Sequence, residues 1–134
     1  MFSLALGWLA PYSSSIGARV EEVRAGYARV NIRDRRRLRN HLSSLHAIAL
    51  INLGEIATGL AVLSSIPDNM RGIVIDIHAD YLSKARGKLV AIAEFDLPQP
   101  LLDDTACVVE ARLLNQDGET VTRVRATWLI GYKK

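Results

Sequence analysis

A single carboxylate interrupts a long apolar stretch near the middle of the chain. Between Ala47 and Pro67 the only charged residue is Glu55. A carboxylate in such surroundings is unfavourable unless it is paired, hydrogen-bonded or neutralised. On a helix, Asn52, Thr58 and Gly59 would share roughly its side. This narrow polar stripe either serves chemistry, or reaches solvent or an interface and does nothing more.

Groups suited to holding a carbonyl oxygen precede this stretch. Asn40 carries an amide donor, and His46 and Ala47 stand where a helix is expected to begin. Unpaired backbone N–H groups and the positive end of the helix dipole gather at such a place. They can polarise a carbonyl, such as that of a thioester, and hold the oxyanion that forms on attack. The simpler alternatives are that Asn40 stabilises the loop and that His46 caps the helix or anchors the loop.

Helix geometry restricts how these residues could cooperate. His46 and Glu55 are nine positions apart, which corresponds to about 2.5 turns and about 13 Å along a helix axis. They therefore face opposite sides, and within one chain they cannot share a small substrate atom. If both belong to one site, Glu55 must come from a second copy. His41 and His78 are expected to be structural or exposed, and the three scattered histidines predict no metal site.

The hydrophobic pattern indicates the elements that position these residues. Residues 16–33 alternate around Gly26 and predict a hairpin, and residues 34–45 are polar and basic and predict a loop. Residues 47–63 are apolar almost all round and lack proline, so they predict a buried helix of about 25 Å. Alternation of apolar residues then predicts four antiparallel strands, within 73–81, 89–97, 107–113 and 124–132, with a turn at 115–118.

The expected element order, β-β-α-β-β-β-β, belongs to an α+β fold. One long apolar helix must be covered by a sheet long enough to curl round it. This is the hotdog fold, a long central helix wrapped by a curved antiparallel sheet. Residues 1–11 are apolar but lack the basic residues of a signal sequence, so we expect a short N-terminal helix rather than a cleaved signal. Residues 1–134 contain no linker or repeat and are expected to form a single domain.

At these residues the chain resembles the hotdog-fold thioesterase superfamily. It is most similar to the phenylacetate-pathway type and to an uncharacterised thioesterase-like branch close to it. The resemblance covers nearly the whole chain. Its signature comprises Arg39-Asn40-His41, Ser43, His46-Ala47 and Glu55, with Pro11-Tyr12 near the start and Tyr81-Leu82-Ser83-Lys84-Ala85-Arg86-Gly87 further on.

The resemblance implies hydrolysis of an acyl-CoA or related thioester. In the superfamily, two central helices pack side by side across a dimer whose sheets join edge to edge. An asparagine and the backbone N–H at the helix start bind the carbonyl, and a carboxylate from the other subunit attacks it or activates water. By resemblance these roles fall on Asn40, Ala47 and Glu55. His46 is a further catalytic candidate, and the expected substrate contacts besides Ala47 are Ser43, Lys84 and Arg86.

The chain departs from this pattern beside the presumed oxyanion site. Many relatives carry glycine where Ser43, Ala47 and Ile48 stand. Ala47 still offers its N–H, but Ile48 adds bulk. That bulk either narrows the choice of acyl group or indicates that catalysis has been lost. The alternative function is therefore a non-catalytic domain that binds an acyl group or coenzyme A. A hotdog dehydratase is disfavoured, because its histidine in a glycine- and proline-rich loop is missing.

Composition and charge restrict the partners. The chain is 49% hydrophobic and 23% charged, as in an ordinary globular domain. The basic cluster between Arg33 and Arg39 is expected to be a solvated loop or a contact for coenzyme A phosphates. Because only 6% of the residues are aromatic and no DNA- or RNA-binding motif is recognisable, a nucleic-acid partner is not expected. The single cysteine, Cys107, suggests a reducing compartment, the cytoplasm. No membrane helix is expected.

The expected assembly follows from the shared site. We expect a homodimer, with a dimer of dimers (a homotetramer) as the alternative assembly. Coenzyme A would enter only as part of the substrate, and no separate cofactor is expected.

Overall fold

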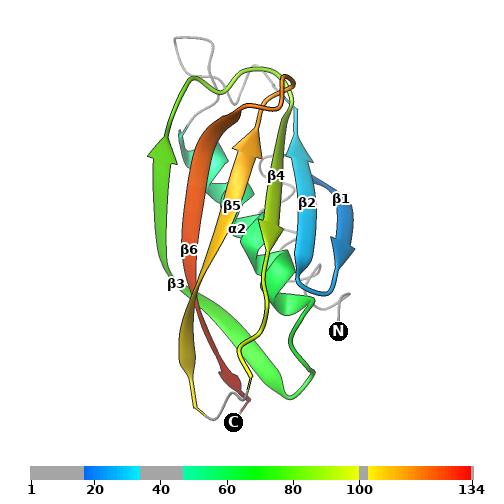
Figure 1. Cartoon of the computed structure of the whole chain (residues 1–134), viewed down its shortest axis with the longest axis vertical. Coiled ribbons are helices and arrows are strands. Elements are labelled where there is room, and N and C mark those ends of the chain that lie inside the picture. The colour runs from blue at the N-terminus through cyan, green and yellow to red at the C-terminus, as the bar shows by residue number, and fades with distance from the viewer. Residues whose placement is uncertain (1–16, 34–46, 100–102, 134) are drawn as a thin grey trace.

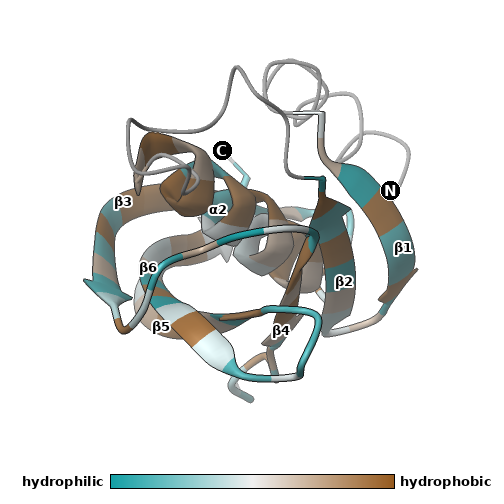
Figure 2. Cartoon of the chain, turned by 90° about the horizontal axis from the view of Figure 1, so that it is seen from above, coloured by the Kyte–Doolittle hydropathy of each residue, from teal (hydrophilic) through white to brown (hydrophobic). Residues whose placement is uncertain are grey.

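The computed structural model describes residues 17–33, 47–99 and 103–133. Within them six strands form one antiparallel sheet in the order β1-β2-β4-β5-β6-β3, and the sheet curves round a single helix, α2 (Figures 1 and 2). The expected sheet and central helix are confirmed. The elements are β1 (Arg19–Arg24), β2 (Tyr27–Ile32), α2 (Ala47–Leu63), β3 (Met70–Tyr81), β4 (Leu89–Glu94), β5 (Thr105–Leu114) and β6 (Thr120–Tyr132).

Two structural expectations fall outside this description. The short N-terminal helix expected within residues 1–11 and the basic loop expected over 34–45 lie outside the described residues. Both remain predictions. In the part of the chain that is described, no helix combines the length and hydrophobicity needed to cross a membrane.

Helix α2 has the bounds expected from its apolar run. Leu53 and Leu60 are fully buried on the side that packs against the sheet, and burying each such side chain contributes roughly 2 kcal/mol. The contact with β6 is close enough to require glycine. A Cβ atom added at Gly54 would lie 2.4 Å from the Cβ of Val124. The sequence therefore fixes both the length of α2 and its close approach to the sheet.

The inner face of the sheet completes the core. Alternate residues of β5 and β6 point inward, with Val109, Ala111, Val124 and Trp128 all buried. Cys107 lies in the same inward row, and burial raises the pKa of its thiol. This agrees with the role of an apolar filler.

The alternation predicted for β3 holds along only part of the strand. A bulge interrupts its pairing with β6 between Val74 and Asp76. Before the bulge Val74 pairs with the buried Trp128, and after it Ile77 pairs with Ala126, so both belong to the inner face. Ile73 and Ile75 are exposed instead. The alternation expected over residues 73–81 would place Ile73 and Ile75 on the same face as Ile77. This grouping was wrong, because one extra residue in the strand reverses the side on which the following residues point.

Two turns are explained by residues that tolerate positive φ. Gly26 joins β1 to β2 with a φ of 77°, and a Cβ there would clash with the carbonyl oxygen of Phe95. Between β5 and β6, Gly118 has a φ of 80°, and the side chain of Asn115 accepts hydrogen bonds from the N–H groups of Asp117 and Glu119. Both turns form where the sequence predicted them.

Candidate active site

The first turn of α2 presents its backbone and one large apolar side chain at the surface. Ala47, the first helical residue, is exposed. Ile48 is 74% exposed, the highest fraction among the large hydrophobic side chains of the described residues. No acidic side chain lies in this turn to neutralise the positive end of the helix dipole. The first N–H groups of such a helix can donate to an anionic or polarised oxygen.

Tyr81 fastens this turn to the sheet. Its hydroxyl donates to the carbonyl oxygen of Ala47 at 3.4 Å, across 34 positions of sequence. Burial raises the pKa of the phenol, which keeps the hydroxyl protonated and able to donate. Tyr81 is the last residue of β3, so the end of the edge strand and the start of the helix lie at the same end of the molecule (Figure 1). The sequence pattern gave no signal for this contact.

Glu55 is a buried carboxylic acid without a compensating partner among the described residues. It is 9% exposed, and no side chain in that part of the chain makes a hydrogen bond or ion pair with its carboxyl group. Burial alone raises its pKa. A carboxyl group that is desolvated rather than paired is a stronger base when ionised, and such groups cluster at functional sites. The structure therefore supports the choice of Glu55 as the chemically distinctive residue of α2.

A chain of hydrogen bonds holds the backbone at Glu55. The indole N–H of Trp128 donates to the hydroxyl of Thr58 at 3.2 Å, and that hydroxyl donates to the carbonyl oxygen of Glu55 at 3.1 Å. Thr58 is fully buried. It was expected to lie roughly on the same side of the helix as Glu55, and its hydroxyl also connects the helix to β6. This connection positions the turn that carries the carboxyl group.

Helix geometry separates Glu55 from the first turn of its own helix. Ala47 and Glu55 are eight positions apart, or about 12 Å along the axis. Glu55 also points about 160° away from Leu53, which faces the core. A carbonyl held at the N–H of Ala47 is therefore beyond direct reach of the Glu55 carboxyl group in the same chain.

The segment between β3 and β4 carries the two cationic side chains that are expected to contact the substrate. The N–H groups of Leu82 and Ser83 both donate to the carbonyl oxygen of Val121, at 2.9 and 3.2 Å, which holds the start of the segment beside β6. Lys84 and Arg86 follow and are exposed, whereas Ala85 between them is buried. Because Tyr81 immediately precedes the segment, these cations emerge at the end of the molecule where α2 begins.

Three of the expected site residues are not placed. Asn40, Ser43 and His46 lie outside the described residues. Of the expected set, the structure describes Ala47, Glu55, Lys84 and Arg86. Their proposed roles are taken up below.

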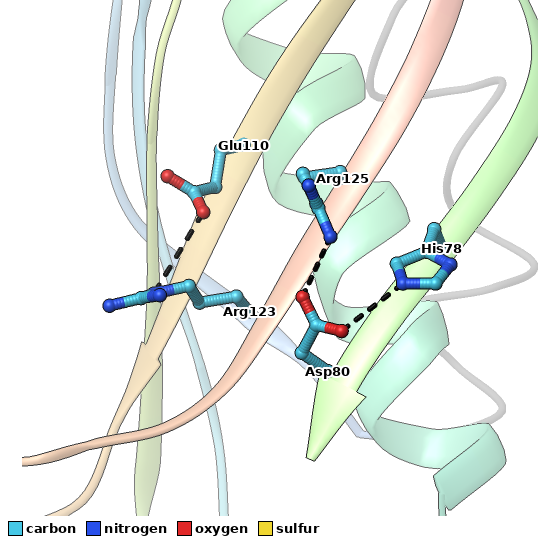
Figure 3. Close-up of polar contacts among 5 residues, drawn as sticks. All are labelled: His78, Asp80, Glu110, Arg123 and Arg125. Carbon is cyan, nitrogen blue, oxygen red and sulfur yellow. Dashed lines mark hydrogen bonds and ion pairs between the residues drawn. The ribbon is translucent and has the colours of Figure 1, made fainter. Parts of the chain in front are cut away.

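A second group of ionisable side chains occupies the outer face of the sheet. Figure 3 shows Asp80 between His78 and Arg125, with its two oxygens 3.1 Å from the imidazole and 2.8 Å from the guanidinium group. His78 and then Arg125 lower the pKa of Asp80. Arg123 reaches Glu110 at 3.9 Å. All five side chains are substantially exposed, so these pairs contribute little to stability. His78 is exposed, as expected.

Metal binding finds no support in this part of the chain. Among residues 17–33, 47–99 and 103–133, no three His, Cys, Asp or Glu side chains gather closely enough to hold a metal ion.

Comparison with known proteins places the chain in a family. Residues 1–130 match the family described as "Domain of unknown function (DUF4442)". The chain belongs to this family. It is 34% identical to the genomics protein APC5556, with a TM-score of 0.85, and the match covers 98% of this chain and 88% of that one. No curated protein matches the chain.

Other solved structures identify the fold. PA5026 from Pseudomonas aeruginosa, described as a probable thioesterase, is 22% identical with a TM-score of 0.83, over 98% of this chain and 95% of that one. The PaaI protein of the E. coli phenylacetic acid degradation operon is 18% identical with a TM-score of 0.78, over 96% and 94%. The DUF4442 chain thus shares the fold of these proteins, which is the hotdog fold that its sequence predicted.

Proposed function

We propose that this DUF4442 protein hydrolyses an acyl-CoA or related thioester at a site shared between two copies of the chain. The observation that carries the proposal is Glu55, whose buried carboxyl group lies on a mostly apolar helix and has no partner among the described residues. Keeping such a group desolvated is unfavourable for the fold, and catalysis offers a reason to retain it. Several solved relatives of the same fold are described as thioesterases.

In the proposed reaction Glu55 attacks the thioester carbonyl or removes a proton from the water that does so. The oxyanion that forms is held by the Asn40 amide and the Ala47 N–H, and His46 assists. The carbon–sulfur bond then breaks, and the leaving sulfur takes the proton that Glu55 removed from water or, after direct attack by Glu55, a proton from solvent. If Glu55 attacks directly, water hydrolyses the acyl-enzyme in a second step. The products are a carboxylic acid and the thiol.

Sharing the site between subunits follows from the 12 Å separation estimated above. Ala47 of one copy and Glu55 of another can face the same carbonyl if two α2 helices pack side by side. The free edge of β3 offers the means of association. It is a 12-residue edge strand with exposed Ile73 and Ile75, and such edges favour pairing with another strand. We therefore propose a homodimer joined along β3, with a dimer of dimers as a further possibility.

The cationic segment after β3 suits the coenzyme A portion of the substrate. Lys84 and Arg86 emerge beyond Tyr81, which contacts the first turn of α2. Cations at that place can meet phosphate groups while the thioester lies at the start of the helix. Ser43 is proposed as a further substrate contact. Coenzyme A would be bound as part of the substrate and not as a resident cofactor.

The test is hydrolysis by a Glu55→Gln variant. This change keeps the shape of the side chain and removes its ability to act as a base or nucleophile, so turnover of a panel of acyl-CoA substrates, followed as free thiol, should fall about 100-fold or more. Asn40→Ala should lower turnover by about 10- to 100-fold, as one of two oxyanion donors. Near-normal turnover by a folded Glu55→Gln protein would reject Glu55 as the catalytic base or nucleophile.

A non-catalytic acyl-binding domain is the second candidate, and Ile48 favours it. This exposed side chain stands beside the proposed oxyanion donor and could crowd the site. Under this alternative, the wild-type protein binds acyl-CoA without releasing thiol. The same thiol assay, combined with a direct binding measurement, distinguishes the two.

A further inference from the structure

Exposed apolar residues flank the contact between the start of α2 and the end of β3. Ile48 follows Ala47, Leu82 follows Tyr81, and the hydrogen bond from Tyr81 to Ala47 joins the two pairs. Tyr81 and Leu82 are each about half exposed, and Ile48 is 74% exposed. Contact of the Ile48 and Leu82 side chains with an apolar ligand would remove their exposed surface from water, which is favourable. We therefore expect an apolar group to lie against them.

The same end of the molecule carries positive charge. Lys84, Arg86 and Lys88 lie in the segment that continues from Leu82, and Lys88 is 3.8 Å from the carboxylate of Glu21. An apolar cluster followed directly by cations matches a ligand with an apolar part and an anionic part. An acyl-CoA has this character, because its acyl chain is apolar and its nucleotide carries phosphates.

We propose that Ile48 determines the size of the acyl group that the site accepts. The inference rests on the proposed function and specifies its substrate class: thioesters with an apolar acyl group, limited in bulk by Ile48. Consecutive Cα atoms are about 3.8 Å apart. A thioester carbonyl bonded to the N–H of Ala47 therefore holds the first carbons of its acyl chain within reach of the Ile48 side chain. Tyr81 and Leu82 complete the apolar surface.

The closing experiment compares three forms of the protein over one substrate series. Wild type, Ile48→Ala and Ile48→Phe are assayed for kcat/KM with straight-chain acyl-CoAs from acetyl to palmitoyl and with phenylacetyl-CoA. A matched control is Val108→Ala, which truncates a 67% exposed side chain on the outer face of β5. Both substitutions to alanine should fold, since each truncates a largely exposed side chain. At position 48 alanine also favours the helix.

The expected result is a change in substrate ranking. Ile48→Ala should lose about 10-fold in kcat/KM on the best wild-type substrate, because contact with the acyl chain is lost, and should gain about 10-fold on bulkier acyl groups. Ile48→Phe should shift the ranking towards smaller groups, and Val108→Ala should leave it unchanged.

Other results would overturn the inference in distinguishable ways. If wild type hydrolyses thioesters and Ile48→Ala keeps the same ranking, Ile48 does not select the acyl group although the proposed function stands. If Ile48→Ala instead dissociates into monomers and loses turnover equally on every substrate, the side chain belongs to the subunit interface and does not select the acyl group. If wild type releases no thiol from any substrate, the proposed function itself fails, and the inference fails with it.

Discussion

Two buried threonines provide a matched test of how the structure stabilises the turn that carries Glu55. Thr58 on α2 and Thr122 on β6 are both fully buried. The hydroxyl of Thr58 accepts a hydrogen bond from Trp128 and donates one to the carbonyl oxygen of Glu55. Among the described residues, the hydroxyl of Thr122 has no hydrogen-bond partner. Replacing each threonine by valine removes a buried hydroxyl, which is hydrogen-bonded at Thr58 and has no partner among the described residues at Thr122.

The expected effects on stability have opposite signs. Thr58→Val removes the acceptor of the Trp128 indole N–H, and we expect it to lower the free energy of unfolding by about 1–3 kcal/mol. Thr122→Val removes an unsatisfied hydroxyl from an apolar setting, so we expect a gain of about 1 kcal/mol. Secondary-structure propensity contributes little, because threonine and valine rank together in helices and both suit strands.

Thermal unfolding monitored by circular dichroism measures both effects. One kcal/mol corresponds to about 3–5 °C in Tm for a chain of this length, so Thr58→Val should melt several degrees below wild type and Thr122→Val slightly above it. Thr58→Val should also lower turnover while Glu55 is retained, since the carboxyl group loses its anchored backbone. A Thr122→Val protein less stable than wild type would show that its hydroxyl is engaged, and equal effects in the two variants would refute the hydrogen-bond argument.

The pH dependence caused by Glu55 and dimerisation along β3 give two further predictions. Burial raises the pKa of Glu55, so turnover should fall as pH drops through that raised pKa, and the folded state binds this proton more tightly than the unfolded state. Ionised Glu55 thus destabilises the fold at higher pH, so in denaturant titrations Glu55→Gln should be more stable than wild type at pH 7 and equally stable below the ordinary pKa of 4.5. In light scattering at micromolar concentration, Ile75→Lys should yield folded monomers, whereas Val108→Lys should remain a dimer; a monomeric wild type would contradict the proposed dimer.

The sequence predicted the fold well because its signals are local. The apolar run from Ala47 to Leu63 gave the helix with the bounds that the structure shows. Alternation gave four later strands, and the Asn115–Gly118 segment gave the last turn. The prediction was wrong at Ile73 and Ile75, where a bulge changes the register and alternation alone cannot reveal the extra residue.

Candidate-site residues could be predicted only where a residue differs clearly in type from its neighbours in the sequence. Glu55 was found because it is the one charge in an apolar helix. Tyr81 was not identified as a contact of the helix start, since its neighbour Ala47 is 34 positions away and only the folded sheet brings them together. Thr58 was grouped with Glu55 on one side of the helix, but a helical wheel could not indicate that the Trp128 indole of β6 donates to its hydroxyl.

The central claim, a thioesterase site built from two chains, is tested most directly by subunit exchange. Homodimers of Asn40→Ala and of Glu55→Gln each have two damaged sites. In a mixed dimer with a shared site, one site collects both substitutions and the other has none. After partial unfolding and refolding of an equal mixture, thiol release should rise well above either parent, towards about one quarter of wild type, since half of the dimers are mixed and each has one intact site of two. Verified mixed dimers with no recovery of activity would contradict the account.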